Sequence, residues 1–127
     1  MYMGMHMEKL VADDNTLHKT STFKMMLATN LYSKFYSCKY AAAHLKDLPL
    51  KGKERGIIVN VSSIVATDGP RGAVAYSTTQ ASVYGMTIPL ARDLGRYGIR
   101  VMCVSGGGFK GPMEKAMSPE AVKFLKT

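Results

Sequence analysis

The chain is predicted to have an α/β fold, a partial doubly wound parallel sheet in the order helix–strand–helix–strand–helix. Two short β-branched runs, 57–61 and 99–104, alternate with longer stretches of helical periodicity. This alternation is typical of parallel strands joined by helical crossovers. Serines or glycines follow each run closely, as they do where ligands bind at the carboxyl ends of parallel strands. We expect residues 1–19 to form a loose tail and residues 20–127 to form part of one domain.

The first helix is expected between Thr20 and Lys46. The residues before it show no sustained period, and Thr20 or Ser21 can cap its N-terminus. Pro49 and Gly52 mark the end of the helical pattern. Apolar side chains recur along it at steps of three and four, which predicts a long amphipathic helix: Phe23, Leu27, Leu31, Phe35, Cys38, Ala42 and Leu45.

The run 57–61 is predicted to be a strand that is buried on both faces. It is continuously apolar apart from Asn60 and lies between a glycine and two serines, a pattern typical of the interior of a parallel sheet. A loop at 68–72 follows it. A second helix is expected from about Ala75 to Arg96, and Pro89 is expected to weaken or kink that helix.

The run 99–104 is predicted to be a second strand, with Gly98 ending the helix before it. Ser118, Pro119 and Glu120 predict the start of a last helix that reaches Lys126, because they supply a cap, a proline in the first turn and an acid there. Two strands make a small sheet. The sequence is therefore interpreted as part of a larger one.

The composition limits the classes of function. The net charge is +8, but the basic residues are spread along the chain without the aromatic–basic pattern of an RNA-binding sheet and without zinc-ligand spacing. Nucleic-acid binding stays an alternative that charge alone favours. Cys38 and Cys103 indicate buried reduced thiols. No apolar run reaches the ~18 residues of a membrane span, and no targeting segment is visible. We expect no metal and no membrane, and a cytoplasmic or mitochondrial-matrix protein.

A serine and a tyrosine 13 positions apart are the strongest functional signal. Ser63 follows the first predicted strand and Tyr76 begins the second predicted helix, so both hydroxyls can reach one carbonyl oxygen at the edge of the sheet. A tyrosine, with a pKa of about 10, is a poor acid–base group at neutral pH unless a nearby cation stabilises its phenolate. The residue four positions on lies over the tyrosine in a helix. That residue is the uncharged Gln80.

These residues resemble the short-chain dehydrogenase/reductase family. The resemblance runs from about residue 23 to residue 126 and includes the segments GMTIPLARDL at 85–94 and YGIRVM at 97–102. It implies that Tyr76 is the general acid–base group, that Ser63 polarises the substrate oxygen and that Asn30 supports a proton-relay water. It also implies NAD as the cofactor, with contacts at Asn60, Gly107 and Phe109.

The sequence departs from the family pattern in several places. Gln80 stands where the family has its catalytic lysine, Gly106 where proline is usual, and Gly111 where a hydroxyl residue contacts the cofactor. The glycine-rich turn that holds a pyrophosphate at a helix N-terminus is not found, since residues 1–22 contain only Gly4. We therefore expect a partial Rossmann-like domain that lacks the N-terminal dinucleotide-binding half.

The resemblance implies a function and leaves one alternative. The family reaction is NAD(H)-dependent oxidation or reduction of small alcohols or ketones, here of the 3-hydroxyacyl-CoA or hydroxysteroid type, and it is expected to be impaired by Gln80. The alternative is a non-catalytic homologue. It would act through the helices at 20–46 and 75–96, which in the family form a dimer face, as a homo-oligomer or in a hetero-oligomer with a relative.

Overall fold

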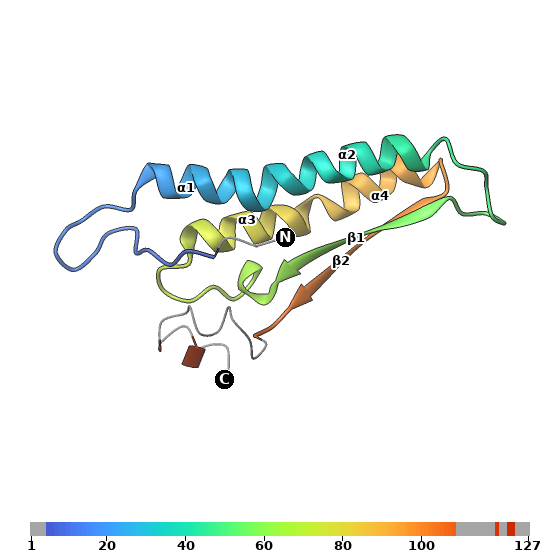
Figure 1. Cartoon of the computed structure of the whole chain (residues 1–127). Coiled ribbons are helices and arrows are strands. Elements are labelled where there is room, and N and C mark those ends of the chain that lie inside the picture. Colours follow the sequence, from blue (N-terminus) through green and yellow to red (C-terminus); the bar gives the residue numbers. More distant parts are fainter. Residues whose placement is uncertain (1–4, 109–118, 120–121, 124–127) are drawn as a thin grey trace.

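The helices lie together on one side of a two-stranded sheet, as Figure 1 shows. The order of elements is α1 (Thr20–Met26), η1 (Leu27–Tyr32), α2 (Ser33–Leu45), β1 (Gly56–Ser63), η2 (Ile64–Ala66), α3 (Val74–Gly85), α4 (Thr87–Gly95) and β2 (Ile99–Gly106). This computed structural model describes residues 5–108, 119, 122 and 123. Within these residues, no helix is long and apolar enough to cross a membrane. The predicted helix at 119–126 lies mostly outside them; Pro119, Val122 and Lys123 are helical.

The first helical run has the predicted extent but not the predicted regularity. The elements α1, η1 and α2 follow one another without a break, and η1 is a π-helical segment. No side chain caps α1: its N-cap residue is Lys19, whose backbone N–H donates to the Glu8 carboxylate at 3.3 Å. The buried positions of the run are Met26, Asn30 and Cys38. The predicted apolar stripe is therefore wrong in position: of its members only Cys38 is buried, Phe35 is 47% exposed, and the polar Asn30 is among the buried residues.

The two strands are parallel and paired along their whole length, from Gly56 opposite Ile99 to Ser63 opposite Gly106. The prediction that β1 is buried on both faces is wrong. Its side chains alternate between buried and exposed, and Ile57, Val59 and Val61 are 41, 50 and 46% exposed. The physical reason is that α2, α3 and α4 all lie against the same face. Among the described residues, nothing covers the other face.

The second helical run is divided in two, α3 and α4, at Met86. The position fits Pro89, which has no N–H to donate to the carbonyl of Gly85 and whose ring crowds that carbonyl. The helix direction is kept, since Leu90 N–H still donates to Met86 at 3.0 Å. The chain then turns at Gly98, where φ is +70°. A Cβ there would lie 2.7 Å from the Lys53 carbonyl oxygen, so only glycine fits this turn.

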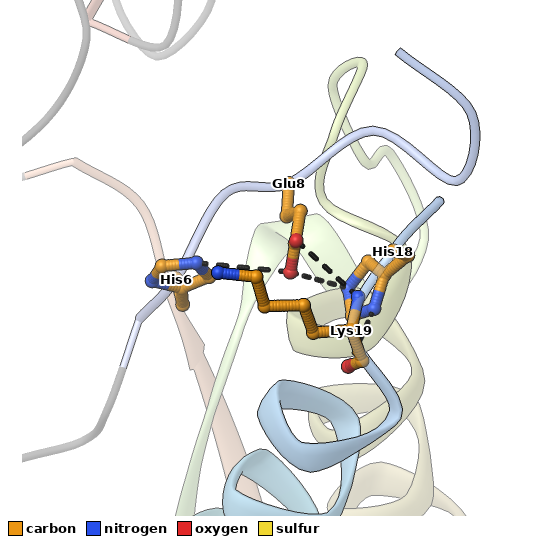
Figure 2. A network of polar contacts seen from close by, with 4 residues as sticks. All are labelled: His6, Glu8, His18 and Lys19. Atoms are coloured by element: carbon orange, nitrogen blue, oxygen red, sulfur yellow. Dashed lines mark hydrogen bonds and ion pairs between the residues drawn. The ribbon is translucent and has the colours of Figure 1, made fainter. Parts of the chain in front are cut away.

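Residues 5–19 were expected to be a loose or partly helical tail, but they form a hairpin-like loop with defined contacts. Ala12 N–H donates to Thr16 at 2.8 Å and His18 N–H to Leu10 at 3.0 Å. Figure 2 shows the Glu8 carboxylate beside the rings of His6 and His18, with Nε2–Oε2 distances of 3.9 and 3.7 Å. The Glu8 N–H donates to Gly72 at 2.8 Å. The loop is thereby attached to the start of α1 and to the turn before α3.

The buried side chains form two clusters at opposite ends of β1. One, which we call the apolar end, is Cys38, Ile58, Ile99 and Val101, with leucines of α2 and α4 packed around it. The other contains Met26, Val65, Ala75 and Tyr76. Buried polar side chains lie in the elements around this second cluster, and together they make up what we call the hydroxyl end: Asn30, Ser62, Thr79 and Gln80.

Candidate active site

Ser63 and Tyr76 lie together at the carboxyl end of β1. Ser63 is the last residue of the strand and Tyr76 is the third residue of α3. The two side chains lie close enough for the Ser63 hydroxyl to act on the pKa of Tyr76. The Ser63 hydroxyl also accepts a long bond of 3.4 Å from the Val65 N–H, which holds the serine oxygen at the start of η2. The spacing therefore brings two hydroxyls within reach of a single carbonyl oxygen.

Burial raises the pKa of Tyr76 above its usual value of 10.0, and the hydrogen bond from Ser63 offsets part of that rise. The side chain is only 2% exposed, so its phenolate would lose most of its hydration. No cation of the described residues stabilises that phenolate. The ammonium of Lys34, which lies at the β1 edge, instead donates to the Val61 carbonyl at 2.7 Å. At neutral pH, the Tyr76 phenol therefore keeps its proton.

Gln80 lies one helical turn after Tyr76 and is completely buried. Neither its amide oxygen nor its amide nitrogen has a hydrogen-bond partner among the described residues. An unpaired buried amide costs about 1–3 kcal/mol. The side chain is thus an available donor and acceptor close to Tyr76, without the charge that would lower the tyrosine pKa.

Asn30 is brought to the same helical turn from the other side. Its amide nitrogen donates to the Thr79 hydroxyl at 3.2 Å, and that hydroxyl donates to the Tyr76 carbonyl at 2.8 Å. Thr79 is not among the residues predicted from the sequence. The sequence feature that could have indicated it is a threonine three positions after the tyrosine. In the structure this threonine lies on the face of α3 toward η1.

Of the three residues predicted to contact a cofactor, the structure describes Asn60 and Gly107. Asn60 lies three residues before Ser63, and its amide contacts the Cys38 sulfur at 3.4 Å. Gly107 follows directly after β2, whose last residue is opposite Ser63. Among the described residues, none lies within 4 Å of the place that a Cβ at Gly107 would take. Phe109, like Gly111, lies outside the described residues. Across the described part of the chain, no group of three or more His, Cys, Asp or Glu side chains could hold a metal ion.

Two adjoining hydroxyls, one from the end of a parallel strand and one from the following helix, define a site that can handle an alcohol or carbonyl group. The family model described as short chain dehydrogenase matches residues 5–121, and the chain belongs to that family.

Two curated relatives share the name 3-hydroxyacyl-CoA dehydrogenase type-2. The chain is 37% identical over 112 residues to 3-hydroxyacyl-CoA dehydrogenase type-2 of Drosophila melanogaster. The matched region covers 87% of this chain and 44% of that protein. It is 35% identical over 109 residues to the Homo sapiens protein of the same name, covering 85% of this chain and 42% of that protein. The chain thus spans less than half the length of these curated relatives.

A solved structure confirms the predicted fold class. The crystal structure of 3-hydroxyacyl-CoA dehydrogenase type-2 from Mycobacterium avium matches with a TM-score of 0.84 at 26% identity, covering 97% of this chain and 55% of that one. The structure of ElxO with NADP bound matches with a TM-score of 0.65 at 29% identity, covering 80% of this chain and 37% of that one.

Proposed function

We propose that this chain carries the alcohol- and carbonyl-handling part of a dehydrogenase site, for a substrate of the 3-hydroxyacyl-CoA or hydroxysteroid type. The observation that supports the proposal best is that Ser63 and Tyr76 lie close together at the carboxyl end of β1, where Ser63 acts on the pKa of Tyr76. The relatives named 3-hydroxyacyl-CoA dehydrogenase type-2 favour the first of these substrate types.

In the reducing direction, the two hydroxyls bind the substrate carbonyl oxygen and Tyr76 donates its proton to it. A raised pKa keeps that proton on the phenol at neutral pH, so this direction is compatible with the site. In the oxidising direction, Tyr76 must first lose its proton. Each unit by which its pKa lies above the working pH costs about 1.4 kcal/mol, so we expect oxidation to be weak near neutral pH and to rise in alkali.

The site also suits one end of a nicotinamide nucleotide, NAD or NADP. The nucleotide would supply or accept the hydride. The unpaired amide of Gln80 can bond to a ribose hydroxyl, and the backbone at Gly107 can approach the nicotinamide amide. ElxO, whose structure is similar to that of this chain, has been solved with NADP bound. We therefore propose nucleotide binding without a preference between the two cofactors.

The test measures binding and turnover separately. NADH and NADPH are titrated calorimetrically, and the oxidation of each is followed with acetoacetyl-CoA as a probe. We expect weak binding and slow turnover that Tyr76→Phe abolishes. Tyr84→Phe is the matched control, because Tyr84 lies on the same helix but is exposed. Turnover that survives in the Tyr76→Phe variant contradicts the proposed role, and the absence of binding at millimolar nucleotide contradicts the enzyme assignment for this chain.

The helical surface supports a second candidate function, association with another copy or a relative. Three tyrosines at steps of four on the first helical run, Tyr32, Tyr36 and Tyr40, are at least half exposed. Tyr84 and Ile88, from α3 and α4, are exposed as well. Tyrosine is enriched in protein–protein interfaces. Light scattering after size-exclusion chromatography tests this: we expect a dimer or larger species that Tyr36→Glu dissociates, whereas a compact monomer at high concentration contradicts the association.

A further inference from the structure

Two buried hydroxyls that take no part in the proposed chemistry bond to the helix that carries Tyr76. The Thr79 hydroxyl donates to the Tyr76 carbonyl at 2.8 Å. The Ser62 hydroxyl donates to the Gln80 carbonyl, one turn further on, at 2.9 Å. Both side chains are almost completely buried. The turn of α3 between Tyr76 and Gln80 therefore has one such bond within the helix and one from β1.

Thr79 also bonds to a second element. A threonine hydroxyl on a helix commonly donates to a carbonyl of the preceding turn, which by itself needs no functional explanation. Here the same oxygen accepts from the Asn30 amide at 3.2 Å across 49 positions of sequence. Asn30 belongs to the π-helical segment η1. Through Thr79, the backbone of Tyr76 is thus connected to the first helical run.

Ser62 makes the corresponding connection to the strand. It immediately precedes Ser63, and successive side chains of a strand point to opposite faces. The Ser62 hydroxyl is bonded to α3 across 18 positions of sequence. This bond fixes where the end of β1 lies along the axis of α3, and the position of Ser63 relative to Tyr76 depends on it.

We propose that Thr79 and Ser62 are positioning residues, which hold α3 against η1 and β1 so that the Ser63 and Tyr76 hydroxyls stay within bonding distance of each other. Their relevance to catalysis rests on the proposed function, because small displacements of reacting groups cost large factors in rate. Their geometric effect does not rest on it. The two can therefore be tested apart.

The test observes the Tyr76 phenol directly. In protein labelled with carbon-13 at the tyrosine Cζ, the signal of Tyr76 is assigned by its loss in Tyr76→Phe, and its shift at pH 7 reports the hydrogen bond at the phenol oxygen. We expect Thr79→Val and Ser62→Ala each to move this signal toward its position in Ser63→Ala, and Thr79→Ser to restore it. Ser82→Ala is the matched control: Ser82 donates to Thr78 on the same helix at 2.8 Å and is expected to leave the signal unchanged.

A protein that carries both Thr79→Val and Ser63→Ala decides whether Thr79 acts through the Ser63–Tyr76 pair. If it does, Thr79→Val adds no further shift to that of Ser63→Ala. The proposal is overturned if Thr79→Val and Ser62→Ala lower stability while the Tyr76 signal keeps its wild-type shift, since that is the result of a merely structural role. Should Thr79→Val fail to fold, Ser62→Ala carries the comparison. None of these readouts needs turnover, so an inactive chain does not affect the outcome.

Discussion

The apolar end and the hydroxyl end of the molecule are built on the same strand and against the same layer of helices, yet they differ in chemistry. At the apolar end, aliphatic side chains and a thiol pack together, and the buried polar side chain of Asn60 is paired with Cys38. At the hydroxyl end, four polar side chains are buried around Tyr76. The first arrangement stabilises the fold, and the second fixes the positions of reactive groups.

The hydroxyl end is less favourable for stability than the apolar end, because the buried side chain of Gln80 destabilises the folded state. Buried hydrogen bonds contribute only about 1 kcal/mol each, whereas an unpaired buried polar group loses more than that. Thr79 and Ser62 have partners, but the Gln80 amide has none among the described residues. Such a group is expected where a ligand, and not the protein, completes the bonding.

The largest effect is expected at the apolar end. Ile99→Ala removes a side chain that is 1% exposed and leaves a cavity, so it should lower the free energy of unfolding by about 2–5 kcal/mol. Urea denaturation measures it. The control is Ile57→Ala on the uncovered face, for which we expect a loss below about 1 kcal/mol. Equal losses at the two positions would contradict the one-sided packing of the sheet.

The next prediction restores a charge at the hydroxyl end. Gln80→Lys places an ammonium one turn from Tyr76, which favours the phenolate and lowers the pKa of Tyr76. Alcohol oxidation at pH 8, followed by nucleotide reduction, should rise roughly tenfold or more. Gln80→Met, which lacks both the charge and the amide, serves as the control for a change of side chain alone. Equal rates in both variants would show that position 80 does not act on the tyrosine.

Removing the unpaired amide should make the chain more stable. Gln80→Met keeps most of the side-chain volume and takes away two buried polar atoms, so we expect a gain of about 1 kcal/mol in the free energy of unfolding. Urea denaturation again measures it. A loss as large as that of Ile99→Ala would mean that the Gln80 amide is bonded in the folded protein, and the contrast between the two ends would weaken.

The smallest effect concerns stability in alkali. The folded-state pKa of Tyr76 is raised above the unfolded value of 10.0. The contribution of the buried, protonated Tyr76 to the free energy of unfolding is therefore fully present below pH 10. It is lost as the pH rises through the folded-state pKa. Urea midpoints between pH 7 and 11 should fall less steeply for Tyr76→Phe than for the wild type, and only above pH 10. A constant difference across the whole range would mean that burial does not oppose ionisation.

The sequence could predict the contact between Ser63 and Tyr76, because a strand, a short loop and a helix constrain where their ends meet. The catalytic roles of the two residues stay predictions. The parallel order of the strands was predictable for a similar reason: the helices between them are long enough for a crossover.

Other features depend on tertiary partners that no local pattern specifies. The apolar run of β1 is the same whether one or both faces are covered, so the exposure of Val59 could not be derived from it. The loop at residues 5–19 depends on Glu8 reaching Gly72, a contact between distant segments. Thr79 resembles any helical threonine until the Asn30 amide is placed against it.

A titration of the Tyr76 phenol by carbon-13 NMR tests the central claim most directly, in the wild type, in Ser63→Ala and in Gln80→Lys. The account predicts an order: the pKa is highest in Ser63→Ala, where only burial acts, intermediate in the wild type and lowest in Gln80→Lys. Indistinguishable pKa values in the three proteins would contradict it, because the tyrosine would then respond neither to its serine partner nor to a charge one turn away.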